Sequence, residues 1–152
     1  LADGLDGLEI GEADSLSICG MGAESIVAIL ERHPARLPKL IVLQPNRRAD
    51  LIRKWGISSG YHLVDEQIAF GHWPYTILTY RKAGSELDPV YQQVDHQAGL
   101  LLGPWLLQRR DTEFVEMLRE ERAYWLQFKQ ISDSSRERLD AIQRVLEVWD
   151  AS

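Results

Sequence analysis

Two short loops, each following an apolar run, carry the groups in this chain that could do chemistry. The run Leu16–Cys19 leads into Gly20-Met21-Gly22, and the run Lys39–Leu43 leads into Gln44-Pro45-Asn46. Glycine lets the backbone approach a bound group closely, and the two amides offer hydrogen-bond donors and acceptors to a ligand. Because open α/β sheets build ligand sites where their strands end, we predict that the two loops face one shared site.

Several kinds of catalytic machinery are missing from the sequence. It has no Ser–His–Asp set and no carboxylate pair, and no metal-ligand spacing surrounds its 1 Cys and 4 His. The lone Cys19 excludes an internal disulfide and fits a reducing compartment. We therefore predict no metal, and a site that either aligns reactants without a strong base or binds without catalysis.

Length and composition describe an ordinary globular chain. With 152 residues and 45% hydrophobic content, it is one domain, or one small domain with an appendage. No apolar stretch reaches the roughly 20 residues of a membrane span, and the acidic start has no signal-peptide character, so we expect a cytoplasmic protein. The net charge is −6, but residues 15–82 carry an excess of Lys and Arg. That excess fits either a phosphate-binding patch or an ordinary solvated surface.

The hydrophobic pattern of the first half predicts an α/β fold. The expected elements are a strand at 16–19, a helix at 23–33, a strand at 39–43, a helix from 47 closed by Gly56 or Gly60, and strands at 61–69 and 75–80. Short connections make the last two strands a hairpin, whereas the first two are joined by a helix and run parallel.

Beyond a composition break at residues 83–85 the pattern becomes helical. A helical segment at 95–108 is broken by Gly103-Pro104, because proline cannot continue a helix. A long helix begins at Asp111 or Thr112, and another at Ser132-Asp133.

Apolar residues mark one face on each of these last two helices. The first has a stripe interrupted by Glu121, and the second has a heptad seam; the stripe is Phe114, Leu118, Trp125 and Phe128, and the seam is Leu139, Ile142, Leu146 and Trp149. Such helices form an antiparallel coiled-coil hairpin. We divide the chain into domains at 1–83 and 84–152.

Four segments, in this order, resemble the bacterial tRNA adenine-22 N1-methyltransferases, which use S-adenosylmethionine. They are Asp3-Gly4-Leu5, Ile18-Cys19-Gly20-Met21-Gly22, Leu43-Gln44-Pro45-Asn46 and Leu102-Gly103-Pro104-Trp105-Leu106-Leu107. The resemblance implies a partial Rossmann-like methyltransferase sheet followed by a coiled-coil domain that helps to hold tRNA. It also implies an enzyme that transfers a methyl group to N1 of an adenine in tRNA.

The resemblance assigns roles to residues of this chain. The cofactor would be bound by Asp3, Gly4, Cys19, Gly20, Met21 and Gly22. The target base would be framed by Gln44, Pro45 and Asn46, and RNA would be contacted by Arg47, Arg48 and Tyr75. Each group also has a structural reading: Asp-Gly is a common turn, the glycines suit a tight strand-to-helix connection, Asn46 suits a helix cap and Tyr75 suits packing on a hairpin.

The sequence departs from this family in one respect. The family's glycine-rich loop and the acidic residue that follows its second strand are absent, so we expect a fragment that is inactive alone. The strand at 16–19 would then have an open edge, covered by the missing N-terminal half or by self-association. Two alternatives remain: a non-catalytic interaction module, and an S-adenosylmethionine-dependent methyltransferase with another substrate.

Overall fold

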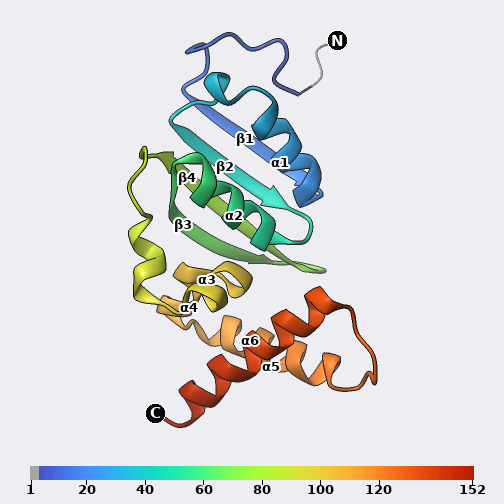
Figure 1. Ribbon diagram of the computed structural model, residues 1–152. Coiled ribbons are helices and arrows are strands. Elements are labelled where there is room, and N and C mark those ends of the chain that lie inside the picture. Colours follow the sequence, from blue (N-terminus) through green and yellow to red (C-terminus); the bar gives the residue numbers. More distant parts are fainter. Residues whose placement is uncertain (1–3) are drawn as a thin grey trace. The chain divides into compact units, whose positions relative to one another are not determined.

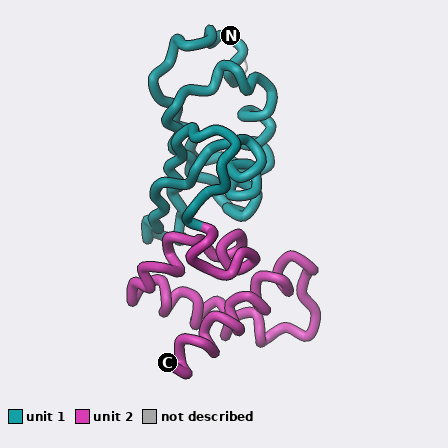
Figure 2. Tube along the Cα trace, turned by 60° about the vertical axis from the view of Figure 1, so that its left-hand side comes forward, with its two compact units in different colours: residues 1–90 teal, residues 91–152 magenta. Residues whose placement is uncertain are grey.

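The chain forms two compact units, residues 1–90 and residues 91–152 (Figure 2). The structure is a computed structural model that describes residues 4–152. Within these residues, no helix combines the length and the hydrophobicity that crossing a membrane requires.

The first unit is a mixed four-stranded sheet with two α-helices on one face (Figure 1). Its elements are β1 (Ser15–Met21), α1 (Ala23–Arg32), the 3-10 turn η1 (Pro34–Arg36), β2 (Leu40–Pro45), α2 (Ala49–Ser59), β3 (Tyr61–Phe70) and β4 (Pro74–Lys82). The strand order is β1-β2-β4-β3, with β1 and β2 parallel and the other pairs antiparallel. The predicted order of strands and helices, the parallel pair and the hairpin are all confirmed.

Alternation along the strands separates a core face from an open face. In β2, Ile41 and Leu43 are fully buried on the face that α1 and α2 cover. Val42 and Gln44 alternate with them and are only half-buried. Cys19 lies beside Gln44 in the parallel register of β1 and β2, so both side chains belong to the open face. The carboxyl ends of these two strands therefore present polar groups away from the core.

The start of α2 differs from the sequence-based prediction, and its end matches one of the two predicted residues. The helix begins at Ala49, not at residue 47, because Arg48 adopts a left-handed conformation with φ 58° and ψ 48°. It ends at Ser59, followed by Gly60 with φ 78°, which is the usual role of glycine after a helix. Gly60 therefore closes the helix, and the alternative of Gly56 is wrong.

Gly56 is glycine because a ring packs against it. It is buried inside α2, and a Cβ atom built there would overlap the ring of Tyr80 from β4. We expect Gly56→Ala to destabilise the chain by about 1–3 kcal/mol, since forced repacking outweighs the better helix propensity of alanine. Hydrogen exchange at α2 amides would measure the loss; unchanged protection would contradict it. Ser58→Ala, at an exposed position of the same helix, is the matched control.

The second unit is helical. Its α-helices are α3 (His96–Leu102), α4 (Pro104–Arg109), α5 (Thr112–Trp125) and α6 (Asp133–Asp150), and the 3-10 turn η2 (Pro89–Gln93) precedes them. The predicted break is confirmed: Gly103, with φ 109°, separates α3 from α4, and Pro104 opens α4. The seam of α6 is buried at Leu139, Ile142 and Leu146. Since α6 packs against α3 as well as α5, its seam serves two neighbouring helices.

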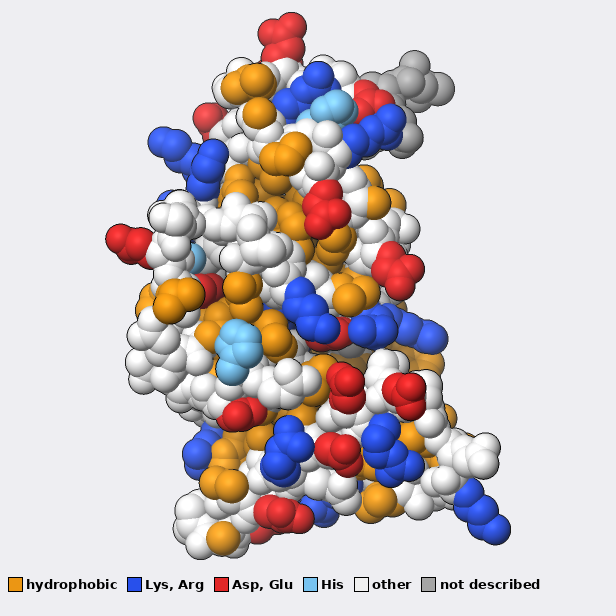
Figure 3. Space-filling view, viewed as in Figure 1, with side chains coloured by type: hydrophobic (Ala, Val, Ile, Leu, Met, Phe, Trp, Pro, Cys, Tyr) orange, Lys and Arg blue, Asp and Glu red, His pale blue; other side chains and the backbone are white. Residues whose placement is uncertain are grey.

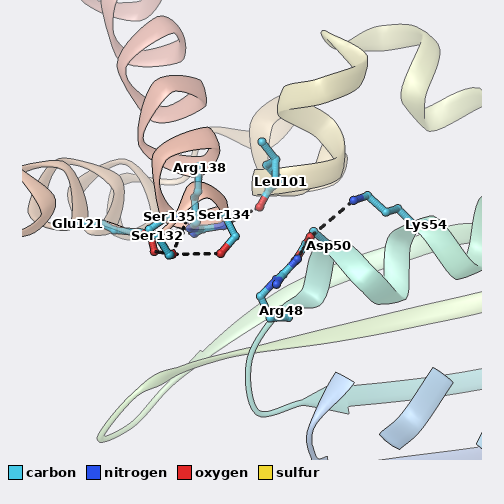
Figure 4. Close-up of polar contacts among 9 residues, drawn as sticks. All are labelled: Arg48, Asp50, Lys54, Leu101, Glu121, Ser132, Ser134, Ser135 and Arg138. Carbon is cyan, nitrogen blue, oxygen red and sulfur yellow. Dashed lines mark hydrogen bonds and ion pairs between the residues drawn. The ribbon is translucent and has the colours of Figure 1, made fainter. Parts of the chain in front are cut away.

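A polar network explains why a glutamate interrupts the apolar stripe of α5. Arg138 of α6 donates two hydrogen bonds to the Glu121 carboxylate, and a third to the Leu101 carbonyl of α3 (Figure 4). Glu121 therefore ties α5 to α6. The stripe is also shorter than predicted, because α5 ends at Trp125 and Phe128 lies beyond it with 46% exposure.

Candidate functional site

β1 and β2 run on through Met21 and Pro45, so most residues of the two predicted loops belong to the ends of these strands. Three hydrogen bonds join the two segments. The Gly20 amide donates to Gln44 Oε1 at 3.0 Å, and Asn46 Nδ2 donates to the Gly20 carbonyl at 3.2 Å. The Asn46 amide donates to the Met21 carbonyl at 2.8 Å. The two predicted loops thus form one continuous polar surface at the carboxyl end of the parallel pair.

The amide side chains of Gln44 and Asn46 make different hydrogen bonds in this surface. Gln44 Oε1 accepts from the Gly20 amide, and Gln44 Nε2 donates to the Pro45 carbonyl at 2.9 Å. Both ends of this side chain are therefore engaged in holding the two loops together. Asn46 is exposed and uses one N–H on Gly20. An amide has a second N–H and a carbonyl oxygen, so Asn46 can still present a donor and an acceptor to a ligand.

The glycines leave room in front of this surface. Gly20 has φ +74°, a left-handed conformation that favours glycine. A Cβ atom at Gly20 or at Gly22 would meet no atom within 4 Å, so neither glycine is explained by crowding. Met21 between them is 36% exposed. The backbone of this loop is therefore open to a bound group.

Cys19 lies at the edge of the same surface. Its side chain is exposed, and its sulfur lies 3.4 Å from the Ser17 hydroxyl on the same strand face. The position beside Gln44 places it next to the loops, as the predicted cofactor contact requires. Within residues 4–152, no group of three His, Cys, Asp or Glu side chains could hold a metal ion.

The two predicted RNA contacts after Asn46 differ in their surroundings. Arg47 and Arg48 are both exposed, the Arg48 side chain by 47%, so exposure admits either as a phosphate contact. Arg48 makes a two-pronged ion pair with Asp50, with Nε to Oδ1 and a terminal nitrogen to Oδ2 each at 2.9 Å (Figure 4). Asp50 is only 7% exposed and was not predicted as a site residue. The one sequence feature that could have indicated its pairing with Arg48 is that the two residues lie two positions apart.

The protonation of Asp50 is set by two opposing effects. Burial by itself raises the pKa of this carboxyl, while the hydrogen bond from Arg48 and the charges of Arg48, Lys54 and Arg53 lower it. The net result is a pKa below the usual value. Asp50 therefore stays ionised and stabilises the fold above its ordinary pKa, and this contribution is lost as the pH falls through the lowered pKa.

The remaining predicted residues lie at different distances from the loops. Tyr75 is half-buried in β4. It precedes Leu78 by three residues, and Leu78 pairs with Leu43 at the last pairing of β2 with β4. Since the strands are antiparallel, Tyr75 lies toward the end of the sheet that carries the loops. Gly4 lies against Ile29 of α1, where a Cβ would be 3.5 Å from Cγ2. Asp3 lies outside the described residues.

Two hollows exist elsewhere in the described structure. In the first unit, a groove of about 530 Å³ runs between α1 and α2, over Val27, Leu51 and Trp55. Figure 3 shows the apolar strip between these helices. In the second unit, a pocket of about 400 Å³ is lined by Arg110, Arg144 and Trp149 among others. The predicted loops line neither of these two hollows.

The mixed four-stranded sheet and its covering helices make this an α/β protein, and its structure is similar to proteins of the Rossmann superfamily. A protein of the NADB-Rossmann superfamily from Streptococcus agalactiae has a similar structure, with a TM-score of 0.76 at 29% identity. The similarity covers 96% of this chain and 66% of that one. The family model for tRNA (adenine(22)-N(1))-methyltransferases matches residues 1–150, and the chain belongs to that family.

Individual relatives agree with this assignment. The tRNA (adenine(22)-N(1))-methyltransferase of Bacillus subtilis is 34% identical over 121 residues, which cover 78% of this chain and 50% of the relative. The chain thus spans about half the length of that curated relative. A Streptococcus pneumoniae structure in complex with S-adenosyl-L-methionine has a TM-score of 0.75 at 26% identity, covering 95% of this chain and 66% of that one.

Proposed function

We propose that the protein transfers a methyl group from S-adenosylmethionine to N1 of an adenine in tRNA. The observation that carries the proposal is the hydrogen-bonded pair of loops, Gly20–Gly22 and Gln44–Asn46, at the carboxyl ends of β1 and β2. The family to which the chain belongs and the cofactor bound by the S. pneumoniae relative support it.

The arrangement suits this chemistry because little proton transfer is required. Adenine N1 carries a lone pair, so the protein must chiefly align it with the methyl group and exclude water. Asn46 would meet the hydrogen-bonding edge of the base, and Pro45 would restrict the loop that carries it. Gln44, occupied by Gly20 and Pro45, would position that loop. The exposed Arg47 would contact the RNA backbone, and Tyr75 would stack on the extruded base.

The residues present fit one side of the cofactor site. S-adenosylmethionine would supply an electrophilic methyl group. The open space before Gly20 and Gly22 would admit it, with Cys19 and Met21 at its border. Asp3 and Gly4 would contribute from the segment before β1, as the resemblance implies.

The remaining assignments concern the wider molecule. We assign residues 1–83 to the carboxyl-terminal half of the methyltransferase core and 84–152 to a helical extension in which α5 and α6 pair as a coiled coil. We place the protein in the cytoplasm. β1 is at the edge of the sheet, and a strand from the amino-terminal half of the fold, or from a second copy, would cover that edge.

The full-length protein, incubated with methyl-labelled S-adenosylmethionine and a tRNA transcript, tests the proposal. We expect N1-methyladenosine in the digested RNA, detected by mass spectrometry, and no label in a matched transcript with guanine at position 22. Label found only in DNA or protein would favour the alternative substrate class. No transfer and no cofactor binding would favour the non-catalytic module.

A further inference from the structure

We propose that Asp50 is a positioning residue for this reaction, acting by holding Arg48 in the left-handed conformation that directs the Asn46 loop. The inference rests on the proposed function for its catalytic consequence. Its structural part, an ordered loop that depends on one buried carboxylate, can be measured independently of any activity.

The ion pair between Arg48 and Asp50 restricts the orientation of the Arg48 side chain. Both Asp50 oxygens accept from the Arg48 guanidinium at 2.9 Å, and this two-pronged arrangement restricts orientation as well as distance. Asp50 is 7% exposed and lies in the first turn of α2. The carboxylate is thus held by the helix, and it holds the side chain of the residue that precedes the helix.

The backbone of Arg48 needs such support. Of the described non-glycine residues, only Arg48 and Arg110 have positive φ, and Arg48 has φ 58°. This conformation is unfavourable for a side chain with a Cβ atom and persists when surrounding contacts impose it. Without the pair, Arg48 would favour negative φ and turn the chain away from its present path.

That path sets the position of Asn46. Two residues separate Asn46 from Ala49, where α2 begins. On its other side, the Asn46 amide donates to the Met21 carbonyl at 2.8 Å and its side chain donates to Gly20. Asn46 is therefore held between the β1 loop and the Arg48–Asp50 pair, and loss of either support would loosen it.

The ion pair with Asp50 gives Arg48 a different role from its neighbour Arg47. A guanidinium engaged by a buried carboxylate gives up charge and donors that a phosphate would need. Both side chains are exposed, but of the two only Arg48 makes an ion pair within residues 4–152. We therefore assign phosphate contact to Arg47 and positioning to Arg48, which changes the role that the sequence indicated for Arg48.

Four substitutions in the full-length protein distinguish positioning from phosphate contact. Arg48→Lys keeps the positive charge but loses the planar guanidinium that donates to both Asp50 oxygens, and Asp50→Asn removes the carboxylate. Arg48→Gly and Arg48→Ala both remove the side chain, but only glycine adopts positive φ without strain. We expect kcat to fall by roughly tenfold to a hundredfold in the first two, with KM for tRNA and its salt dependence unchanged. Arg48→Gly should retain more activity than Arg48→Ala.

Hydrogen exchange supplies a readout besides activity. The Asn46 amide should exchange faster in Arg48→Lys and Asp50→Asn, while amides in β4 keep their protection and show that the variants are folded. Arg119→Lys, in the exposed pair of Arg119 with Asp150, is the control and should change neither the exchange nor kcat.

Two results would overturn the inference. One is wild-type kcat and wild-type Asn46 exchange in Asp50→Asn. The other is a weaker, less salt-dependent tRNA affinity in Arg48→Gly and Arg48→Ala alike, which would make Arg48 an RNA contact. If the wild-type protein transfers no methyl group, the proposed function fails, and the exchange data still decide whether Asp50 orders the loop.

Discussion

Replacing Asn46 with alanine should lower the rate of methyl transfer by roughly a hundredfold or more while the protein remains folded. The exposed amide stands at the carboxyl end of β2 and is held by its hydrogen bond to Gly20. Removing one oriented hydrogen-bonding group from a reacting centre has effects of about this size. Single-turnover rates with saturating cofactor and tRNA would measure the change in the chemical step.

A matched amide separates this effect from a general loss of structure. Gln67 is an exposed amide in β3, where Nε2 donates to Asp65 at 2.8 Å, and Gln67→Ala should keep the wild-type rate. Binding of S-adenosylmethionine by Asn46→Ala should stay close to normal, because the proposed role of Asn46 is toward the base. An Asn46→Ala enzyme with wild-type single-turnover rates would remove this residue from the site.

Local sequence patterns were sufficient for the parts of the fold that depend on alternation and on glycine or proline. The buried run at β2 and the hairpin of β3 and β4 follow from side-chain periodicity, and the break at Gly103 follows from backbone chemistry. The proximity of the two loops could also be predicted, because parallel strands end at the same edge of a sheet. Here the sequence pattern and the topology agree.

Features that depend on tertiary partners could not be predicted in this way. Gly56 looked like a helix end, yet it is required by the Tyr80 ring, which approaches from β4. Glu121 looked like an interruption, yet Arg138 binds it from α6. The charge of Arg48 indicated an RNA contact, whereas the burial of its partner Asp50, on which we base its proposed positioning role, was not visible in the sequence. In each case the deciding partner comes from another element or from burial, neither of which local periodicity reports.

The largest effect on stability should come from the buried ion pair of Arg53 and Glu66. Arg53 Nε lies 2.8 Å from Glu66 Oε2, and the side chains are 2% and 0% exposed. Arg53→Met would leave the carboxylate buried without this cation, and we expect a loss of about 3–5 kcal/mol in the free energy of unfolding. Hydrogen exchange of the most protected β3 and β4 amides would measure it.

The double variant Arg53→Met/Glu66→Leu tests the physical reason for that loss. Removing both charges should restore most of the stability, because the cost lies in leaving one charge buried rather than in losing the attraction between the two. The pair of Arg119 with Asp150 provides the comparison at the same 2.8 Å distance, with side chains 49% and 52% exposed. Arg119→Met should cost only about 0–1 kcal/mol. Equal losses at the buried and the exposed pair would show that distance alone, and not desolvation, sets the contribution of these contacts.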